Sequence, residues 1–158
     1  MIKAAILTVS DSCAAGQRQD VSGQTIEDML APKIYQVCEK KITPDDLDAI
    51  TAELKHFSDE VRVEVVLTTG GTGFGPRDIT PEATAQVCER LVPGISELIR
   101  AKGLEKTKKA VLSRGLAGIR DKTLIINLPG SPKGAKESLE IILDILPHAV
   151  DMLRGGGH

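Results

Sequence analysis

The sequence holds few aromatic side chains and little net charge. It contains no Trp, one Tyr and two Phe among 158 residues, and its formal net charge at pH 7 is −2. With so few aromatic rings, neither stacking of single-stranded nucleic acid nor an aromatic cage for a cation is expected. The weakly negative charge also argues against a general nucleic-acid binder. We therefore expect an aliphatic core and no nucleic-acid partner.

Cysteine is scarce and long apolar runs are absent. The three cysteines, Cys13, Cys38 and Cys88, show no CxxC spacing, so neither a zinc site nor a disulfide framework is expected. No apolar run approaches the roughly 20 residues that span a bilayer. The chain begins with a strand pattern, so we expect no signal peptide. These features predict a cytoplasmic protein with no membrane partner.

Strand and helix patterns alternate along the chain. At 158 residues and 41% hydrophobic content it fits one domain, residues 1–158. Apolar runs and helical spacing predict strands at 2–9, 34–42, 61–68 and 123–128, a short strand or extended run at 110–114, and helices at 22–30, 43–54, 80–91 and 94–102. A last helix is predicted from 131 to a kink or break at Pro147, followed by a final turn. This order is typical of an α/β domain with helices on both faces of a mainly parallel sheet.

The longest polar connection follows the third predicted strand. Residues 65–82 read as a strand, a loop containing Thr69-Gly70-Gly71-Thr72-Gly73 and Asp78, and a helix start at Thr80. Glycines let consecutive N–H groups turn toward one anion without a Cβ in the way. The loop lacks the Gly-Lys-Ser/Thr ending of a P-loop, and Pro76 separates it from the helix, unlike the dinucleotide fingerprint. It therefore predicts a phosphate-binding loop of another kind, the alternative being a surface connection that binds nothing.

Polar residues follow the carboxyl end of each main predicted strand. They are Ser10 and Asp11 after the first strand, Asp45 after the second, the glycine loop after the third, and Ser131 and Lys133 after the last. Right-handed crossovers place the carboxyl ends of parallel strands at one edge of the sheet, where open α/β sheets bind their ligands. The shared placement of these residues predicts a single site.

Each of these residues also has a plain structural alternative. Asp11 could cap its own turn, and Asp45 could be a partner of the helix dipole. Asp78 could form an Asx-turn, and Ser131 could begin an ordinary helix. Basic side chains near the loops could be solvated surface charges: Arg77, Lys133 and, as a weaker site candidate still, Arg114.

Acidic groups beside a phosphate loop point to a divalent cation. Carboxylates and phosphates repel each other unless a cation lies between them, and Mg²⁺ binds through one or two carboxylates and substrate phosphates. Asp11, Asp45 and Asp78 therefore indicate Mg²⁺, with Asp78 as the preferred metal ligand. Positioned donors together with a metal are what phosphoryl or nucleotidyl transfer requires.

The motifs taken together resemble the MogA/MoaB molybdopterin-binding family over essentially the whole chain. The most specific block is Thr69-Gly70-Gly71-Thr72-Gly73 with Asp78-Ile79-Thr80-Pro81-Glu82, and the supporting blocks are Thr8-Val9-Ser10-Asp11, Asp20-Val21-Ser22-Gly23, Pro44-Asp45-Asp46 and Leu128-Pro129-Gly130. The chain departs from the family at Ser12, where many relatives carry an arginine.

The resemblance implies a three-layer α/β/α domain, commonly a trimer, that acts late in molybdenum cofactor biosynthesis. The implied activity is that of a nucleotidyltransferase: the terminal phosphate of molybdopterin attacks the α-phosphorus of Mg²⁺-ATP, giving adenylyl-molybdopterin and pyrophosphate. The product could pass to a molybdenum-inserting protein. The alternative within the family is a MoaB-like protein that binds molybdopterin without catalysis.

The resemblance also assigns roles to individual residues. Asp45 and Asp78 match the family's essential aspartates, with Asp78 at the metal and phosphate and Asp45 orienting the pterin or the nucleophile. The residues implied to bind substrate and phosphate are Ser10, Asp11, Thr69, Gly70, Gly71, Thr72, Gly73, Ser131 and Lys133.

Overall fold

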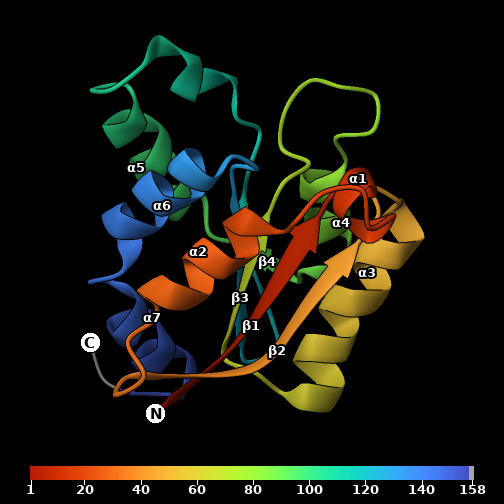
Figure 1. Cartoon of the computed structure of the whole chain (residues 1–158). Helices are drawn as coiled ribbons and strands as arrows, with labels where there is room; N and C mark the ends of the chain where they lie inside the picture. Colours follow the sequence, from red (N-terminus) through yellow and green to blue (C-terminus); the bar gives the residue numbers. More distant parts are fainter. Residues whose placement is uncertain (157–158) are drawn as a thin grey trace.

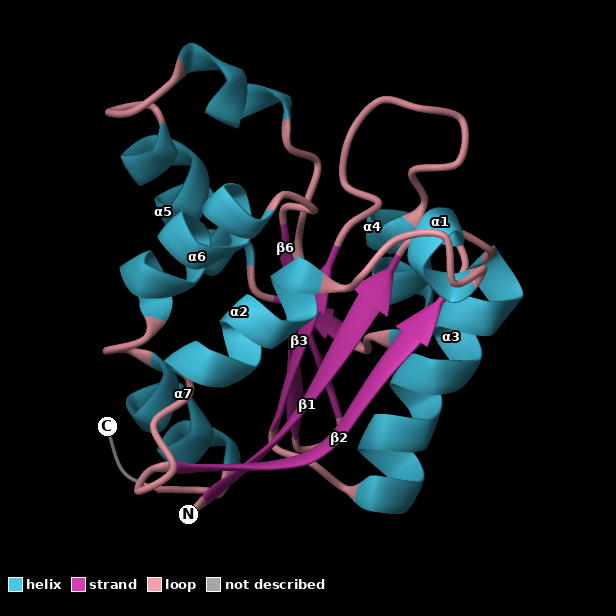
Figure 2. Cartoon of the chain, in the orientation of Figure 1, coloured by secondary structure: helices cyan, strands magenta, loops and turns pink. Residues whose placement is uncertain are grey.

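A six-stranded sheet lies between two layers of helices (Figures 1 and 2). The computed structural model describes residues 1–156. In the order of their positions across the sheet, the strands are β2 (Tyr35–Thr43), β1 (Ile2–Val9), β3 (Val65–Thr69), β6 (Thr123–Leu128), β5 (Ala117–Arg120) and β4 (Arg90–Leu91). The first four are parallel to one another, as the sequence predicts, and β2 is an edge strand.

The four parallel strands end almost level with one another. Val9 at the end of β1 pairs with Thr43 of β2, and Thr69 at the end of β3 pairs with Thr8 of β1 and Leu128 of β6. The connections that leave these strands therefore start side by side at the carboxyl edge of the sheet.

Helices cover both faces of the sheet, which confirms the three-layer α/β/α fold. One face carries α2 (Val21–Met29), α5 (Pro93–Gly103), α6 (Pro132–Ile142) and α7 (Leu146–Leu153). The other carries α3 (Leu47–Lys55), the π-helix η1 (His56–Val61) and α4 (Thr80–Val87). The one-turn helix α1 (Asp11–Ala14) and the 3₁₀ helix η2 (Lys108–Leu112) lie in connections.

The two hydrophobic cores follow from strand alternation. Successive side chains of a strand point to opposite faces, so Ala4 and Ile6 of β1 pack toward α2 and α6, whereas Ala5 and Leu7 pack toward α3 and α4. Phe57 is the one fully buried aromatic ring among the described residues, which bears out the prediction of an aliphatic core.

The far edge of the sheet differs from the prediction. The extended run expected at 110–114 is wrong, because Lys108–Leu112 forms the 3₁₀ helix η2. The strand on this side is β5, which pairs antiparallel with β6, and β4 pairs antiparallel with β5. The helix expected at 80–91 ends at Val87, since Cys88 turns to an extended conformation that leads into β4.

Two other predicted boundaries are also wrong. The third strand begins at Val65 rather than at residue 61, because η1 continues to Val61 and Arg62 then takes a left-handed conformation with φ 58°. The segment after Pro147 is the helix α7 rather than a final turn, since a proline is tolerated in the first turn of a helix. The single-domain boundary, residues 1–158, stays a prediction.

Among the described residues, 1–156, we find no helix with both the length and the apolar character needed to cross a membrane.

Candidate functional site

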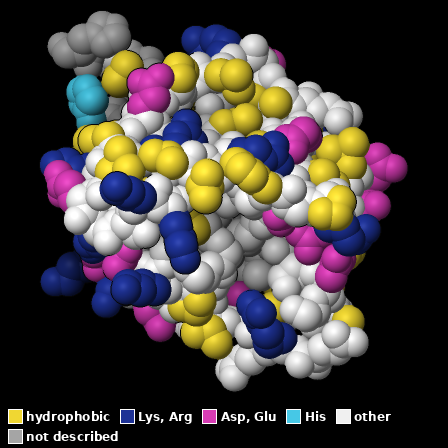
Figure 3. Space-filling model, turned by 90° about the horizontal axis from the view of Figure 1, so that it is seen from above, with side chains coloured by type: hydrophobic (Ala, Val, Ile, Leu, Met, Phe, Trp, Pro, Cys, Tyr) yellow, Lys and Arg dark blue, Asp and Glu magenta, His cyan; other side chains and the backbone are white. Residues whose placement is uncertain are grey.

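A cavity of about 760 Å³ opens at the carboxyl edge of the sheet. Seen from that edge, the face of the molecule is hollowed near its centre (Figure 3). The connections that follow β1, β2, β3 and β6 all contribute to the lining. The predicted site residues that line the cavity are Ser10, Asp45, Thr69, Gly70, Gly71, Asp78 and Ser131. Residues far apart in the sequence are thus brought to one place, as predicted.

The other predicted residues do not line this cavity: they are Asp11, Thr72, Gly73 and Lys133. Asp11 contacts two neighbouring loops, as described below, and Lys133 is exposed. Thr72 and Gly73 offer their carbonyl oxygens to Arg114, at 2.9 Å from its backbone N and 2.8 Å from its Nε. Contacts of these residues with a ligand stay predictions.

Gly70 and Gly71 are required by the shape of the loop. Their φ angles are 104° and 69°, values that favour glycine. A Cβ on Gly70 would lie 2.2 Å from the carbonyl oxygen of Val9, and a Cβ on Gly71 would lie 2.2 Å from Thr80 Oγ1. These close approaches let the loop pack directly against the connection after β1 and against the start of α4.

At the start of the loop, one backbone amide is hydrogen-bonded to the protein and three are not. The Gly70 N–H donates to the carbonyl oxygen of Leu128, 3.2 Å away. Among residues 1–156, the N–H groups of Gly71, Thr72 and Gly73 have no protein acceptor. Of residues 70–73, these three have amides that could contact an anion, and Gly70 contributes its lack of a side chain.

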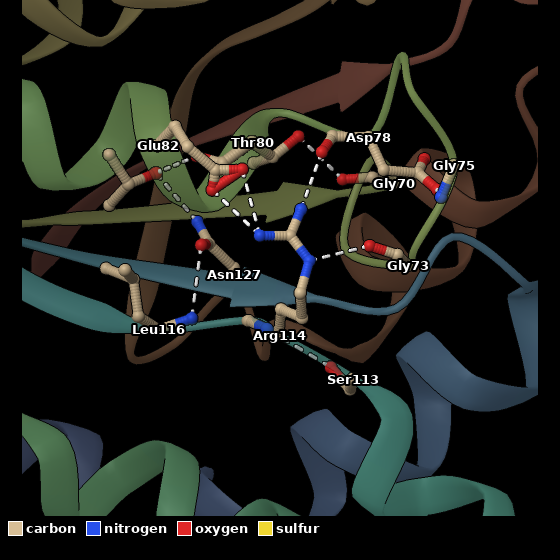
Figure 4. Close-up of polar contacts among 12 residues, drawn as sticks. Gly70, Gly73, Gly75, Asp78, Thr80, Glu82, Ser113, Arg114, Leu116 and Asn127 are labelled. Atoms are coloured by element: carbon tan, nitrogen blue, oxygen red, sulfur yellow. Dashed lines mark hydrogen bonds and ion pairs between the residues drawn. The ribbon is translucent and has the colours of Figure 1, made fainter.

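Hydrogen bonds from α4 hold the start of the glycine loop. Thr80 donates its hydroxyl to Gly70 O at 2.8 Å (Figure 4). Its N–H donates to Gly71 O at 3.1 Å. Thr84 in turn donates its hydroxyl to Thr80 O, and the buried Asn127 donates to the hydroxyls of Thr68 and Thr84. The loop is thus fixed to both α4 and β6.

Asp45 lies in the connection before α3 and faces the cavity. A helix starting at Thr43 and Pro44 was expected, with Asp45 near its dipole, and this is wrong: Asp46 is the N-cap, accepting from the Ala49 N–H at 2.9 Å. Asp45 is consequently free to bond elsewhere. Its Oδ2 accepts the N–H of Asp11 at 2.9 Å, and its own N–H donates to Asp11 Oδ1 at 3.0 Å.

The electrostatic environment of Asp45 favours its protonated form. Burial raises the pKa of the Asp45 carboxyl, and the negative charges of Asp11 and Asp78 raise it further. The hydrogen bond from the Asp11 N–H and the charge of Arg77 act in the opposite direction. A cation placed beside Asp45 and Asp78 would relieve this repulsion.

Asp78 lies at the far end of the glycine loop, facing the same cavity as Asp45. Its Oδ2 accepts the N–H of Gly75 at 2.8 Å, and Asp78 N–H donates to Gly75 O at 3.0 Å, so a tight turn holds the carboxylate. A Cβ on Gly73 or Gly75 would lie 2.9 Å from Oδ2. The turn foreseen as an alternative role therefore exists, and it leaves Asp78 beside the cavity.

Asp11 joins three connections rather than capping its own turn. Arg77 donates to both of its oxygens, from Nε at 2.6 Å and from Nη2 at 3.0 Å, and the pair with Asp45 completes the set. The Arg77 guanidinium is the main cause that lowers the pKa of Asp11. Ser10 is the residue that caps α1, accepting from the Cys13 N–H at 3.2 Å.

Ser131 begins α6 in the ordinary way. Its hydroxyl accepts the N–H of Gly134 at 3.0 Å, and Pro132 follows at the first helical position. Both residues nevertheless line the cavity, so the capped helix end faces the site.

Several lining residues were not among the predicted site residues. Asp20, which accepts from Thr8 Oγ1 at 2.7 Å and Gly23 N at 2.9 Å, caps α2 beside the cavity, and Ser22 donates to Gly130 O. Arg18 is the single Lys or Arg among the lining residues that the structure describes. Asp20 belongs to the Asp20-Val21-Ser22-Gly23 block that supports the family resemblance, which was the signal available for it, whereas nothing in the sequence marked Arg18.

In the described part of the chain, the cavity residues form no group of metal-ligating side chains. Within residues 1–156, three or more His, Cys, Asp or Glu side chains do not come together as a group able to hold a metal ion. The role of Asp78 as a metal ligand stays a prediction.

Comparison with known proteins identifies the family. The family model for the probable molybdopterin binding domain matches residues 5–148. The chain is 43% identical over 152 residues to a molybdopterin adenylyltransferase from Helicobacter pylori strain J99, covering 95% of this chain and 86% of the relative. It is 34% identical over 168 residues to the molybdopterin adenylyltransferase of Escherichia coli K12, covering 98% of this chain and 86% of the relative.

A solved structure shares the fold. The molybdopterin biosynthesis enzyme MoaB from Thermus thermophilus superposes with a TM-score of 0.93 at 48% identity, covering 98% of both chains. The family match over residues 5–148 and the identity to the relatives show that the chain belongs to the probable molybdopterin binding domain family.

Proposed function

We propose that this protein is a molybdopterin adenylyltransferase of molybdenum cofactor biosynthesis. The names of relatives that match nearly the whole chain support this activity. The single observation that carries it is that Asp45 and Asp78, which belong to different connections of the sheet, face one cavity with the glycine loop. A protein that only bound a phosphate ligand would gain nothing from two acids facing it.

The proposed reaction joins two phosphates. A terminal phosphate oxygen of molybdopterin attacks the α-phosphorus of ATP, forming one P–O bond while the bond to the pyrophosphate oxygen breaks. The products are adenylyl-molybdopterin and pyrophosphate. Such a transfer depends on positioning and charge stabilisation more than on covalent chemistry by the protein.

The residues of the cavity divide this work between them. The free N–H group of Gly71 would bind a phosphate oxygen, and the end of α6 at Ser131 would hold a second anionic group. Asp45 would orient the pterin or the attacking phosphate, since it is fixed by Asp11 and lines the cavity.

Mg²⁺ is the cation that suits these residues. It binds through one or two carboxylates together with substrate phosphates, and Asp45 and Asp78 supply two carboxylates at the cavity. Burial raises the pKa of Asp45, and the charges of Asp11 and Asp78 raise it further. When bound, Mg²⁺ would neutralise negative charge on the phosphates. Asp78 is the proposed protein ligand.

The resemblance to the family supports three further proposals. The protein would act as a homotrimer in the cytoplasm, and it would hand its product to a molybdenum-inserting protein. The mass of the protein in solution tests the trimer, cell fractionation tests the cytoplasmic location, and product transfer between purified proteins tests the hand-over.

An assay with molybdopterin, ATP and Mg²⁺ tests the proposed function. We expect pyrophosphate release that requires molybdopterin. Tight molybdopterin binding without pyrophosphate would instead indicate a binding-only relative. ATP binding that ignores molybdopterin would indicate a general nucleotide-binding protein.

A further inference from the structure

Arg114 forms several hydrogen bonds with the glycine loop. Its Nε donates to Gly73 O at 2.8 Å and its Nη2 to Asp78 O at 2.6 Å (Figure 4). Its backbone N–H donates to Thr72 O at 2.9 Å. Arg114 does not line the cavity itself. One side chain thus holds both limbs of the loop, the limb that leaves β3 and the limb that carries Asp78.

Glu82 fixes the orientation of this guanidinium. Nη1 of Arg114 lies 2.9 Å from each of the two carboxylate oxygens of Glu82, on the first turn of α4. The Glu82 carboxylate is the largest cause that raises the pKa of Arg114, and the charge of Asp78 contributes too. Each of the three guanidinium nitrogens therefore has an acceptor, which leaves the side chain little freedom to turn.

Among the described contacts, few others hold the outer part of the loop, residues 74–77. Phe74, Gly75, Pro76 and Arg77 are exposed, and Phe74 retains 71% of its accessible surface. The turn between Gly75 and Asp78 is internal to this exposed segment, so it cannot fix the segment relative to the sheet. Arg77 ties its outer side to Asp11, through a pair in which both side chains are exposed.

We propose that Arg114 is a positioning residue, which fixes the carboxylate of Asp78 in the site by holding the Gly73 and Asp78 carbonyls, with Glu82 as its support. The proposal rests on the proposed function for the reaction that Asp78 serves. Arg114 acts on the substrate only through Asp78 and the loop. A misplacement of about 1 Å at a reacting group can cost roughly 10²-fold in rate.

Arg120 offers a matched control. It makes the same kind of three-point contact, with the Asp59 carboxylate at 3.0 Å from Nε and 2.8 Å from Nη2, and with Val87 O at 2.9 Å from Nη1. Its partner Asp59 lines a different cavity, at the opposite edge of the sheet. Arg114 and Arg120 should therefore have similar structural roles and different effects on turnover.

Steady-state kinetics of Arg114→Ala, Arg114→Lys and Arg120→Lys test the proposal. For both Arg114 variants we expect kcat to fall about 10²-fold while KM for molybdopterin stays within about twofold, since a lysine ammonium cannot reach three separate acceptors. Arg120→Lys should keep the wild-type kcat. Full activity of Arg114→Lys, or an equal loss in Arg120→Lys, would overturn the proposal.

Amide hydrogen exchange supplies a readout that does not depend on activity. In Arg114→Lys the amides of residues 73–79 should exchange faster, and those of β3 and α4 should not change. Unchanged exchange in the loop would contradict the proposal even if kcat fell. If the wild type released no pyrophosphate, the proposed function would fail, and exchange would still decide whether Arg114 holds the loop. Glu82→Gln gives the same test should the Arg114 variants not fold.

Discussion

Two cavities of nearly equal volume lie at opposite edges of the sheet. The one at the carboxyl edge measures about 760 Å³, and the one at the amino edge, lined by Lys3, Asp59, Glu64 and Arg154 among others, about 730 Å³. Their difference lies in how the charges are paired. Volume alone therefore does not identify the site.

At the amino edge two of the lining acids, Asp59 and Glu64, have cationic partners. Arg120 binds Asp59, and Arg154 Nη2 lies 2.9 Å from Glu64 Oε2, so both acids have a lowered pKa, caused first by the hydrogen bond from the arginine. At the carboxyl edge, burial and neighbouring acids raise the pKa of Asp45. Acids that are paired with arginines are typical of a stable protein surface. An acid whose pKa is raised by burial and by neighbouring acids instead indicates a candidate site for a cation or another ligand.

The sharpest way to break this comparison is to neutralise one acid in each cavity. We expect Asp78→Asn to lower turnover by about 10³-fold, as the loss of a key electrostatic group does, and to leave the fold intact. Asp121→Asn, in the cavity at the amino edge, should leave turnover unchanged. Asp121 has a φ of 51°, which asparagine tolerates. Pyrophosphate release measures both, and near wild-type turnover in Asp78→Asn would remove that residue from the mechanism.

The second prediction separates backbone strain from steric clash in the glycine loop. Gly71→Ala should lower the free energy of unfolding by about 3 kcal/mol, because it combines a left-handed φ with a Cβ that would lie 2.2 Å from Thr80 Oγ1. Turnover should fall as well. Gly16 has a similar φ of 73° and no atom within 4 Å of an added Cβ, so Gly16→Ala should cost only about 1 kcal/mol.

Urea unfolding of both glycine variants, beside the transfer assay, checks this prediction. Equal losses of stability would mean that φ alone decides, and that the approach of Thr80 to Gly71 contributes nothing.

The smallest expected effect concerns the paired cavity. Glu64→Gln should lower the free energy of unfolding by about 1 kcal/mol or less at pH 7, since Arg154 is partly exposed, and should not change turnover. Arg154 lowers the pKa of Glu64 in the folded state. The stabilisation is therefore present above the unfolded pKa of about 4.3 and disappears as the pH falls through the lower folded value. A difference between the proteins that persisted at pH 2 would contradict this assignment.

Much of the central sheet follows from sequence patterns. Strands β1 and β6 are continuous apolar runs, and β3 runs directly into the glycine loop, so their parallel order and shared carboxyl edge could be predicted. Short strands could not. β5 contains a glycine and only four residues, and β4 has two, so neither builds a recognisable apolar pattern.

The site residues that directly follow strands could be predicted from the sequence. The roles that depend on contacts between residues far apart in the sequence could not. Asp46 took the N-cap in place of Thr43, because its carboxylate reaches the N–H of Ala49, and only the folded chain shows that Asp45 then bonds to Asp11. Arg114 looked like a weak candidate in the sequence. The partners of its side chain lie 32 to 41 residues away, and no local pattern encodes such contacts.

The reversed direction of β5 has a consequence for how this edge of the sheet can be built. Ala117 pairs with Ile126 and Arg120 with Thr123, so β5 starts close to where β6 stops. In a wholly parallel sheet, the strands only end at the carboxyl edge, and no strand begins there. Here the segment that leads into β5 reaches that edge too. It brings the guanidinium of Arg114 to the glycine loop, which follows β3. The single reversal of strand direction at β5 thus gives the glycine loop a supporting contact, from Arg114, that the parallel strands do not provide.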